Sequence, residues 1–326
     1  MNILIFMNNV LPVNKYGGTQ RIMWWLAKEY NNMGHKVTFL SKKGTTCNFA
    51  DVIFYNPEKS FDSQVPQNID IIHFNSTPTE DISKPFLVSI RGNGQKGERF
   101  LKNTVFLSKN HAERHSSNAF VYNGLDFDDY GKPDFKINRE HLLFLAKASW
   151  KVKNLEGVID ISKKSKQKLA VVGGNRLNIK MGFRFTPSLN IKFHGLVGGE
   201  PKNKILNKSK ALLFPVLWHE PFGIAIIEAL YFGMPVFGTT YGSLPEIITS
   251  DVGFLSNKKL EIIEEIQNIE KYNRQYCYQY VCDNFNSKIM AKGYLKYYEK
   301  VLNNEEINKK EPFSNDDYNK KILDFE

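Results

Sequence analysis

Cysteine is scarce in this sequence, and long apolar runs are missing. The three cysteines, Cys47, Cys277 and Cys282, are too few for a disulfide framework and do not pair with histidines at the spacing of metal ligands. No stretch reaches the ~18 apolar residues that a membrane-spanning helix needs. The opening apolar run, residues 3–7, is too short for a signal peptide and follows no basic residue. We therefore expect a cytoplasmic protein, which can still rest on the inner face of a membrane.

Positive charge is in excess, and one part of the chain carries it. The 326 residues hold 44 Lys and Arg against 34 Asp and Glu, a formal net charge of +10. Residues 1–135 have a net charge of +2, residues 136–210 of +13 and residues 211–326 of −5. Such an excess indicates an anionic partner, which can be a nucleic acid, a membrane surface or a phosphorylated small molecule. The hydrophobic fraction of 42% excludes wholesale disorder.

Short apolar runs alternate with segments of helical periodicity along most of the sequence. Residues 3–6 and 142–146 are typical of buried strands, and residues 20–32 and 155–165 are typical of the helices that follow them. Strands that are apolar on both faces and separated by helices predict a parallel sheet covered on both sides. The fold class that we predict is α/β.

One polar segment interrupts this alternation. Residues 128–134 contain both Gly131 and Pro133 and are typical of a linker. We therefore predict two Rossmann-like domains, residues 1–132 and 137–285, whose parallel sheets face one another across a cleft. Ligands should bind at the carboxyl ends of the strands.

Two glutamates, Glu220 and Glu228, flank the start of an apolar helix. The segment between them opens with Pro-Phe-Gly at 221–223, where Pro221 suits a first helical position and Gly223 lets a ligand approach the backbone. The free N–H groups and the positive dipole at such a helix end suit a phosphate. Glu228 should lie about two turns inside the helix, where a buried carboxylate needs hydrogen-bond donors such as sugar hydroxyls. The alternative is an ordinary amphipathic helix with an incidental glutamate.

The same stretch continues into Gly-Met-Pro-Val at 233–236. With this arrangement the sequence resembles glycosyltransferase family 4, retaining transferases of the GT-B fold, and in particular a bacterial surface-polysaccharide transferase. The resemblance covers nearly the whole chain and implies that residues 286–326 form a terminal helix and tail that cross back onto the first domain. The further landmarks are Gly17-Gly18, Ser108, Asn123-Gly124-Leu125-Asp126, residues 171–174, His194-Gly195, residues 242–246 and residues 285–298.

The resemblance also implies a role for each matching residue. Glu220 would contact the hydroxyls of the donor sugar, and Glu228 would bind the ribose of the nucleotide. Lys147 and Lys153 stand where the family has an Arg and a Lys, and they would act in catalysis with Glu220. The other residues that it implies at the donor are Gly18, Gly173, His194, Phe222, Gly223 and Ile224.

The reaction explains why cations belong at 147 and 153. A departing nucleoside diphosphate needs positive charge where negative charge develops on its oxygens. Lysines supply point charges without the bidentate fork of an arginine. A solvated basic loop is the alternative for this segment, and the lysines at 163, 164, 166 and 168 are more typical of a wet helix face.

The first domain departs from the family at one position. Arg91 follows a predicted strand where family members commonly have a histidine, and an arginine cannot act as a general base because it stays protonated. Arg91 can instead bind a phosphate or an acceptor carboxylate. His73, at the end of another strand, is either an acceptor-side contact or a satisfied core residue.

Three further patterns invite other interpretations. Residues 92–97 spell G-x-G-x-x-G, but neither a long helix nor a suitably placed acidic residue follows, as a dinucleotide site requires. Asp126-Phe127-Asp128 spells the Asp-x-Asp of metal-dependent transferases but falls in the linker. Ser243 and Glu246 match a capping box.

We thus expect a retaining transferase that moves a sugar from a nucleotide diphosphate sugar to a saccharide or lipid-linked saccharide. It would need no metal or other cofactor and would bind no nucleic acid, and peripheral membrane contact is compatible with it. Two alternatives stay open. A GT-B-fold nucleotide-sugar epimerase would convert the donor without an acceptor, and a non-catalytic basic module would bind nucleic acid with a steep dependence on salt.

Overall fold

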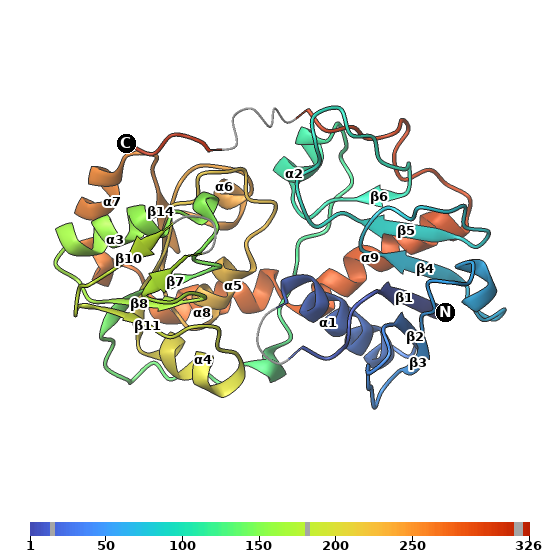
Figure 1. The fold of residues 1–326 in the computed structure, drawn as a ribbon, viewed down its shortest axis with the longest axis horizontal. Coiled ribbons are helices and arrows are strands. Elements are labelled where there is room, and N and C mark those ends of the chain that lie inside the picture. The colour runs from blue at the N-terminus through green and yellow to red at the C-terminus, as the bar shows by residue number, and fades with distance from the viewer. Residues whose placement is uncertain (14–16, 180–182, 316–321) are drawn as a thin grey trace. The chain divides into compact units, whose positions relative to one another are not determined.

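A computed structural model describes residues 1–13, 17–179, 183–315 and 322–326. It divides the chain into two compact units (Figure 1). The first comprises Met1–Asp126 with Phe285–Tyr318, and the second comprises Phe127–Asn284 with Asn319–Glu326. Residues 316–321, part of the predicted tail, lie outside the described residues.

The first unit is built on a six-stranded sheet of order β3-β2-β1-β4-β5-β6, in which every neighbouring pair is parallel. Helices α1 and α9 pack against each other, and the hydroxyl groups of Tyr30 and Tyr298 lie 3.2 Å apart between them. The elements are β1 (Asn2–Met7), α1 (Gly18–Asn32), β2 (Lys36–Ser41), β3 (Asp51–Phe54), η1 (Asp62–Gln64), β4 (Ile71–Phe74), β5 (Phe86–Ser89), β6 (Thr104–Val105), α2 (Lys109–Arg114) and α9 (Ser287–Leu302).

The second unit repeats this plan with a six-stranded parallel sheet of order β11-β8-β7-β12-β13-β14. Its core joins strand residues such as Leu142 and Phe144 to Val158 and Ile161 of α3. The elements are η2 (Phe127–Asp129), β7 (His141–Leu145), η3 (Lys151–Lys153), α3 (Leu155–Lys164), β8 (Leu169–Val172), β9 (Leu177–Asn178), β10 (Arg184–Phe185), β11 (Ile191–Phe193), α4 (Gly199–Asn207), β12 (Ser209–Phe214), α5 (Ile224–Tyr231), β13 (Val236–Gly238), α6 (Leu244–Ile247), β14 (Gly253–Leu255), α7 (Lys259–Ile266), η4 (Ile269–Lys271) and α8 (Arg274–Asn284). The predicted α/β class with parallel sheets is confirmed.

The strand orders locate the position where each sheet can receive a ligand. In the second unit the chain runs from β7 outward through β8 to β11, and then returns to the other side of β7 to form β12. The loops after β7 and β12 therefore diverge and leave a crevice at the carboxyl ends of these two strands. In the first unit the same reversal occurs between β1 and β4.

The first boundary lies earlier than the predicted 132. Residues after Asp126 belong to the second unit, because aromatic side chains within the polar segment pack there. Phe127 stacks on Tyr231 with ring centroids 4.8 Å apart, and Tyr130 is only 4% exposed. A linker that is polar by composition is thus partly a packed segment.

The end of the chain also differs from the predicted tail. Residues 322–326 pair with the second unit and not with the first: Leu323 N–H donates to Leu217 O at 2.8 Å, and Glu326 N–H donates to Asn257 O at 3.0 Å. Phe325 packs against the core of that unit. Backbone pairing of this kind leaves no periodic signal in the sequence.

The landmark at 123–126 joins the first sheet to the start of α9. Leu125 N–H donates to Phe285 O at 2.8 Å, and Ser287 N–H donates to Leu125 O at 2.8 Å. A Cβ atom on Gly124 would lie 2.1 Å from Asn286 O, so only glycine permits this crossing. The landmark therefore has a structural role in this chain.

We predict that Gly124→Ala destabilises the first unit by about 1–3 kcal/mol, because the backbone of α9 must shift to accept the added methyl group. Gly92→Ala is the matched control, since a Cβ atom there meets nothing within 4 Å. Urea unfolding followed by circular dichroism measures both. Equal urea midpoints for Gly124→Ala and Gly92→Ala would contradict the close approach of Gly124 to the Asn286 backbone.

Candidate active site

Lys153 and Glu220 form a buried salt bridge between the loops that follow β7 and β12. Lys153 Nζ lies 2.5 Å from Glu220 Oε2, and the two side chains are 10% and 9% exposed. Trp218 Nε1 donates to the same oxygen at 2.7 Å. Lys153 Nζ also lies 4.9 Å from the centroid of the Trp218 ring, a distance at which a cation interacts with an aromatic face. The strand order thus brings two of the predicted catalytic residues into direct contact.

Lys147 lies on the same loop as Lys153 but is held differently. Its Nζ stands 5.1 Å from the centroid of the Trp150 ring, and within the described part of the chain the Lys147 side chain forms neither an ion pair nor a hydrogen bond. Its neighbour Ala148 donates its N–H to Gly173 O at 2.9 Å. A Cβ atom on Gly173, whose φ is +105°, would lie 2.0 Å from Ala146 O. Gly173 therefore lets the lysine loop approach β8.

The turn at 220–223 begins α5 later than we predicted. Gly223 has φ 85° and stands at the N-cap, and the helix begins at Ile224 and not at Pro221. A residue in the left-handed region cannot lie inside a right-handed helix, so the glycine fixes the boundary. Glu228 consequently lies about one turn inside α5, and Phe222 is buried at 1% exposure.

The loop after β13 supports this turn. Ser243 Oγ donates to Phe222 O at 2.8 Å, and Ser243 N–H donates to Glu220 O at 3.0 Å. The Ser243 side chain makes no capping hydrogen bond, so the interpretation of Ser243 and Glu246 as a capping box was wrong. A Cβ atom on Gly242 would lie 2.3 Å from Glu220 N, which requires glycine there.

Glu228 is buried, and protein groups meet its need for hydrogen-bond donors. Lys202 Nζ donates to Glu228 Oε1 at 2.7 Å, and Tyr130 Oη donates to the same atom at 2.5 Å. The Lys202 and Glu228 side chains are 7% and 6% exposed. Sequence reasoning missed both partners. The sequence holds one indication that Lys202 is buried. It lies four residues before the buried Leu206 and therefore on the apolar face of α4.

The remaining donor-side predictions fall in two different units. His194 directly follows β11, donates its N–H to Val171 O at 2.9 Å and is half-buried. Burial lowers the pKa of its imidazole, and the charge of Lys192 lowers it further. Gly18 belongs to the first unit, where it is the first residue of α1.

His73 is an interior residue of the first unit. It is 0% exposed, its Nδ1 lies 2.6 Å from Tyr298 Oη, and its Nε2 lies 2.8 Å from Ser89 Oγ. Burial holds the pKa of the imidazole well below its ordinary value, and the charge of Arg91 adds to this effect. The predicted acceptor-side contact does not fit a side chain closed off in this way, and the satisfied core residue is the interpretation that the structure supports.

Arg91 lies two residues beyond β5 and is half-buried. Its Nη1 donates to Asn123 Oδ1 at 2.9 Å, and its Nη2 lies 3.1 Å from Met23 Sδ. The guanidinium thus ties the loop after β5 to the landmark segment at 123–126.

The other patterns have structural explanations. After residues 92–97 the chain continues through turns into β6, with no helix between. Asp126 is paired with Lys28, whose Nζ lies 2.6 Å from its Oδ2. Among the described residues no group of three or more His, Cys, Asp or Glu side chains is arranged to hold a metal ion. Every helix among the described residues is too short or too polar to cross a membrane.

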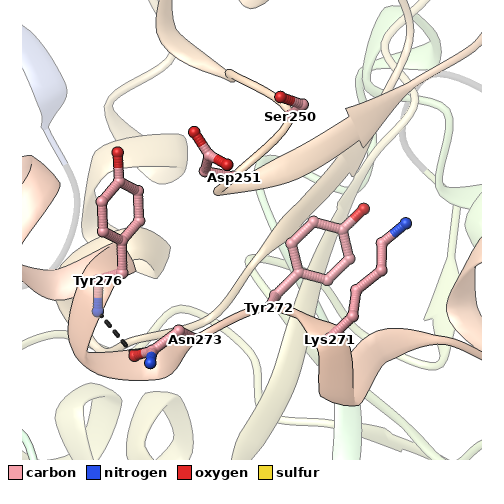
Figure 2. Close-up of a pocket in the computed structure, with 6 residues that line it drawn as sticks. All are labelled: Ser250, Asp251, Lys271, Tyr272, Asn273 and Tyr276. Atoms are coloured by element: carbon pink, nitrogen blue, oxygen red, sulfur yellow. Dashed lines mark hydrogen bonds between the residues drawn. The ribbon is translucent and has the colours of Figure 1, made fainter.

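A pocket of about 490 Å³ lies on the second unit (Figure 2). Asp251, which lines the pocket, precedes β14. The pocket therefore lies at the amino-terminal ends of the parallel strands, whereas the loops after β7 and β12 lie at their carboxyl ends. It contains none of the predicted site residues. The residues that line it are Ser250, Asp251, Lys271, Tyr272, Asn273 and Tyr276.

We predict that Lys202→Met lowers the free energy of unfolding of the second unit by about 3–5 kcal/mol, because it leaves the buried Glu228 carboxylate without its cation. Adding Glu228→Gln should recover more than half of this loss. Lys204→Met on the same helix removes an exposed pair with Glu200 and should leave the midpoint unchanged. Chemical denaturation measures all three, and a double variant as unstable as the single one would show that the pair is not the cause.

Residues 129–280 match the family model described as Glycosyl transferases group 1. A Klebsiella pneumoniae relative, described as an uncharacterized 41.2 kDa protein in cps region, is 26% identical over 152 residues, which span 44% of this chain and 41% of that protein. The chain therefore matches about two fifths of the length of this curated relative.

Two solved structures show the fold at low sequence identity. A glycosyltransferase involved in avilamycin A biosynthesis has a TM-score of 0.71 at 18% identity, over 93% of this chain and 98% of that one. The Anabaena protein HepE in complex with UDP-glucose has a TM-score of 0.63 at 15% identity, over 93% of this chain and 99% of that one. The chain thus has the GT-B fold, and the match to the model of glycosyl transferases group 1 falls within its second unit.

Proposed function

We propose that this chain is a retaining, metal-independent glycosyltransferase of the family 4 type. It would take a sugar from a nucleotide diphosphate sugar and transfer it to a saccharide or lipid-linked saccharide. The observation that carries the proposal is the meeting of Lys153 and Glu220 at 2.5 Å, beside the start of α5 and at the strand reversal of a glycosyltransferase group 1 domain.

The cations are arranged as a leaving diphosphate requires. Lys153 is fixed by its carboxylate and by the Trp218 ring, whereas Lys147 has no ionic partner among the described residues. The N–H groups of Ile224 and Ala225 at the start of α5 have no partner inside the helix and favour an anion, whereas Ile226 N–H donates to Gly223 O at 2.9 Å. In the proposed complex Lys147 and Lys153 neutralise the phosphate oxygens as the glycosidic bond breaks.

Glu220 is suited to hold the donor sugar. Both hydrogen bonds of its carboxylate end on Oε2, and none of the described residues bonds to Oε1. We assign Oε1 to a hydroxyl of the donor sugar. The acceptor hydroxyl would then attack from the side of the leaving group and give its proton to a departing phosphate oxygen, which retains the configuration at the anomeric carbon.

Glu228 would accept the ribose hydroxyls, with Lys202 and Tyr130 fixing its carboxylate. Gly18, Gly173 and His194 stay predicted neighbours of the donor. A role in surface-polysaccharide synthesis agrees with the relative in the cps region, and a lipid-linked acceptor would bring the protein to the inner face of the membrane.

The first test is donor binding. A panel of UDP-, GDP-, ADP- and dTDP-sugars should contain one that stabilises the protein by about 2.7 kcal/mol at 100 times its dissociation constant. Lys147→Ala should weaken that ligand at least tenfold because it removes a cation from the diphosphate. The exposed Lys151, on the same loop, provides the control Lys151→Ala. If none of the panel stabilises the protein, the donor site is wrongly assigned.

The second test separates the two glutamates. Glu228→Gln should weaken nucleotide binding, because an amide is a poorer acceptor for ribose hydroxyls. Glu220→Gln should mainly lower kcat, because its oxygen touches the sugar whose bond breaks. Transfer to an added acceptor, compared with conversion of the donor alone, also distinguishes a transferase from an epimerase. Equal loss of binding in both variants would rule out separate roles.

A further inference from the structure

Residues 322–326 lie at the edge of the second sheet that carries the candidate site. Leu323 N–H donates to Leu217 O at 2.8 Å, in the loop that follows β12. The hydroxyl of Tyr241, in the loop that follows β13, donates to Asp324 O at 2.7 Å. Because β12 and β13 are parallel neighbours, both loops leave the carboxyl end of the sheet, where ligands of such sheets bind.

The same segment also reaches the loop after β14, the next strand of the sheet. Glu326 N–H donates to Asn257 O at 3.0 Å, and Lys259 N–H donates to Glu326 O at 2.5 Å. Asn257 is itself bonded to the loop after β13, since its Oδ1 accepts the N–H of Thr240 at 3.0 Å. Residues 322–326 therefore tie together the loops after three adjacent strands, β12, β13 and β14, and we call this segment the strap.

Leu217 connects the strap to the lysine loop. Its carbonyl oxygen accepts from Leu323, and its own N–H donates to Val152 O at 2.8 Å. Val152 directly precedes Lys153, and Leu217 lies three residues before Glu220. A continuous line of backbone hydrogen bonds thus joins the strap to both of the loops whose side chains meet in the buried salt bridge.

Tyr241 connects the strap to the turn at Glu220 by a second route. Its ring lies against that of His219, with centroids 5.9 Å apart and planes at 80°. The two residues that follow it support the same turn, because Gly242 lies against the Glu220 backbone and Ser243 N–H donates to Glu220 O. By accepting the Tyr241 hydroxyl, the strap restrains the loop that supports the catalytic carboxylate.

One apolar side chain anchors the strap. Phe325 packs against the core of the second unit, whereas the side chain of Ile322 is 52% exposed. A backbone hydrogen bond in a partly exposed segment contributes little net free energy, because water can replace the protein partner. Burial of the large Phe325 ring therefore contributes most to keeping the strap on the loops.

We propose that residues 322–326 are a positioning strap for the donor site, which holds the loops of Lys153 and Glu220 in the geometry that a nucleotide diphosphate sugar requires. A site of this kind needs its charged groups to be placed within about 0.5 Å of the productive arrangement, and loops reach such precision only when they are held. The inference rests on the proposed function for the identity of the ligand, whereas the restraint on the loops is measured without one.

The first test is amide hydrogen exchange in the full chain without ligand. Phe325→Ala should speed the exchange of the Leu217 and Thr240 amides at least tenfold relative to the amides of β8, because release of the strap opens the loops that contain them. Phe325→Leu keeps an apolar anchor and should restore slow exchange. Ile322→Ala is the matched control in the same segment and should behave as the unaltered protein.

The second test is the effect on the donor. With the nucleotide diphosphate sugar that stabilises the unaltered protein most, Phe325→Ala should raise the dissociation constant at least fivefold and lower kcat at least tenfold, because Lys153 and Glu220 lose their placement. Phe325→Leu should recover most of both losses. Ile322→Ala should change neither.

Two results would overturn the proposal. Unchanged exchange of Leu217 and Thr240 in Phe325→Ala would show that the strap does not hold the loops. Faster exchange with unchanged donor affinity and kcat would show that it holds them without positioning the site. If no nucleotide sugar binds the unaltered protein, the proposed function fails and the role of the strap toward a donor fails with it, while the exchange rates still decide whether the strap restrains the loops.

Discussion

The salt bridge between Lys153 and Glu220 is the contact on which the candidate site depends. It joins two loops that leave adjacent strands and then diverge, and it lies among aromatic rings where few water molecules can screen it. Such a pair tolerates burial only because each charge compensates the other. In the proposed complex its geometry would orient both the cation that meets a phosphate and the carboxylate that meets a sugar. Lys147, whose side chain has no such partner among the described residues, would then bind the diphosphate.

Glycines make this arrangement sterically possible. Gly173 lets the lysine loop lie against β8, Gly242 lets the loop after β13 lie against Glu220, and Gly223 turns the chain into α5. At each of these positions φ is positive, and at Gly173 and Gly242 a methyl group would also collide with backbone. These three glycines thus help to position the charged side chains of the two loops.

Local patterns predicted the parallel sheets, the helices that became α1 and α3, and the residues of the two loops. They did not predict contacts between distant segments, because such contacts depend on which side chains the fold brings together. Lys202 and Tyr130 are bonded to Glu228 across 26 and 98 residues, and His73 is closed in by Tyr298 from α9. Such contacts also explain part of the excess of positive charge, because Lys153 and Lys202 neutralise buried glutamates.

The most direct measurement is a crystal structure of the chain with the nucleotide diphosphate sugar that stabilises it most. We expect diphosphate oxygens within hydrogen-bonding distance of Lys147 Nζ, Lys153 Nζ and the backbone N–H of Ile224, with a sugar hydroxyl on Glu220. A diphosphate found instead in the pocket beside Asp251 and Tyr276, or on the lysines of α3, would contradict it.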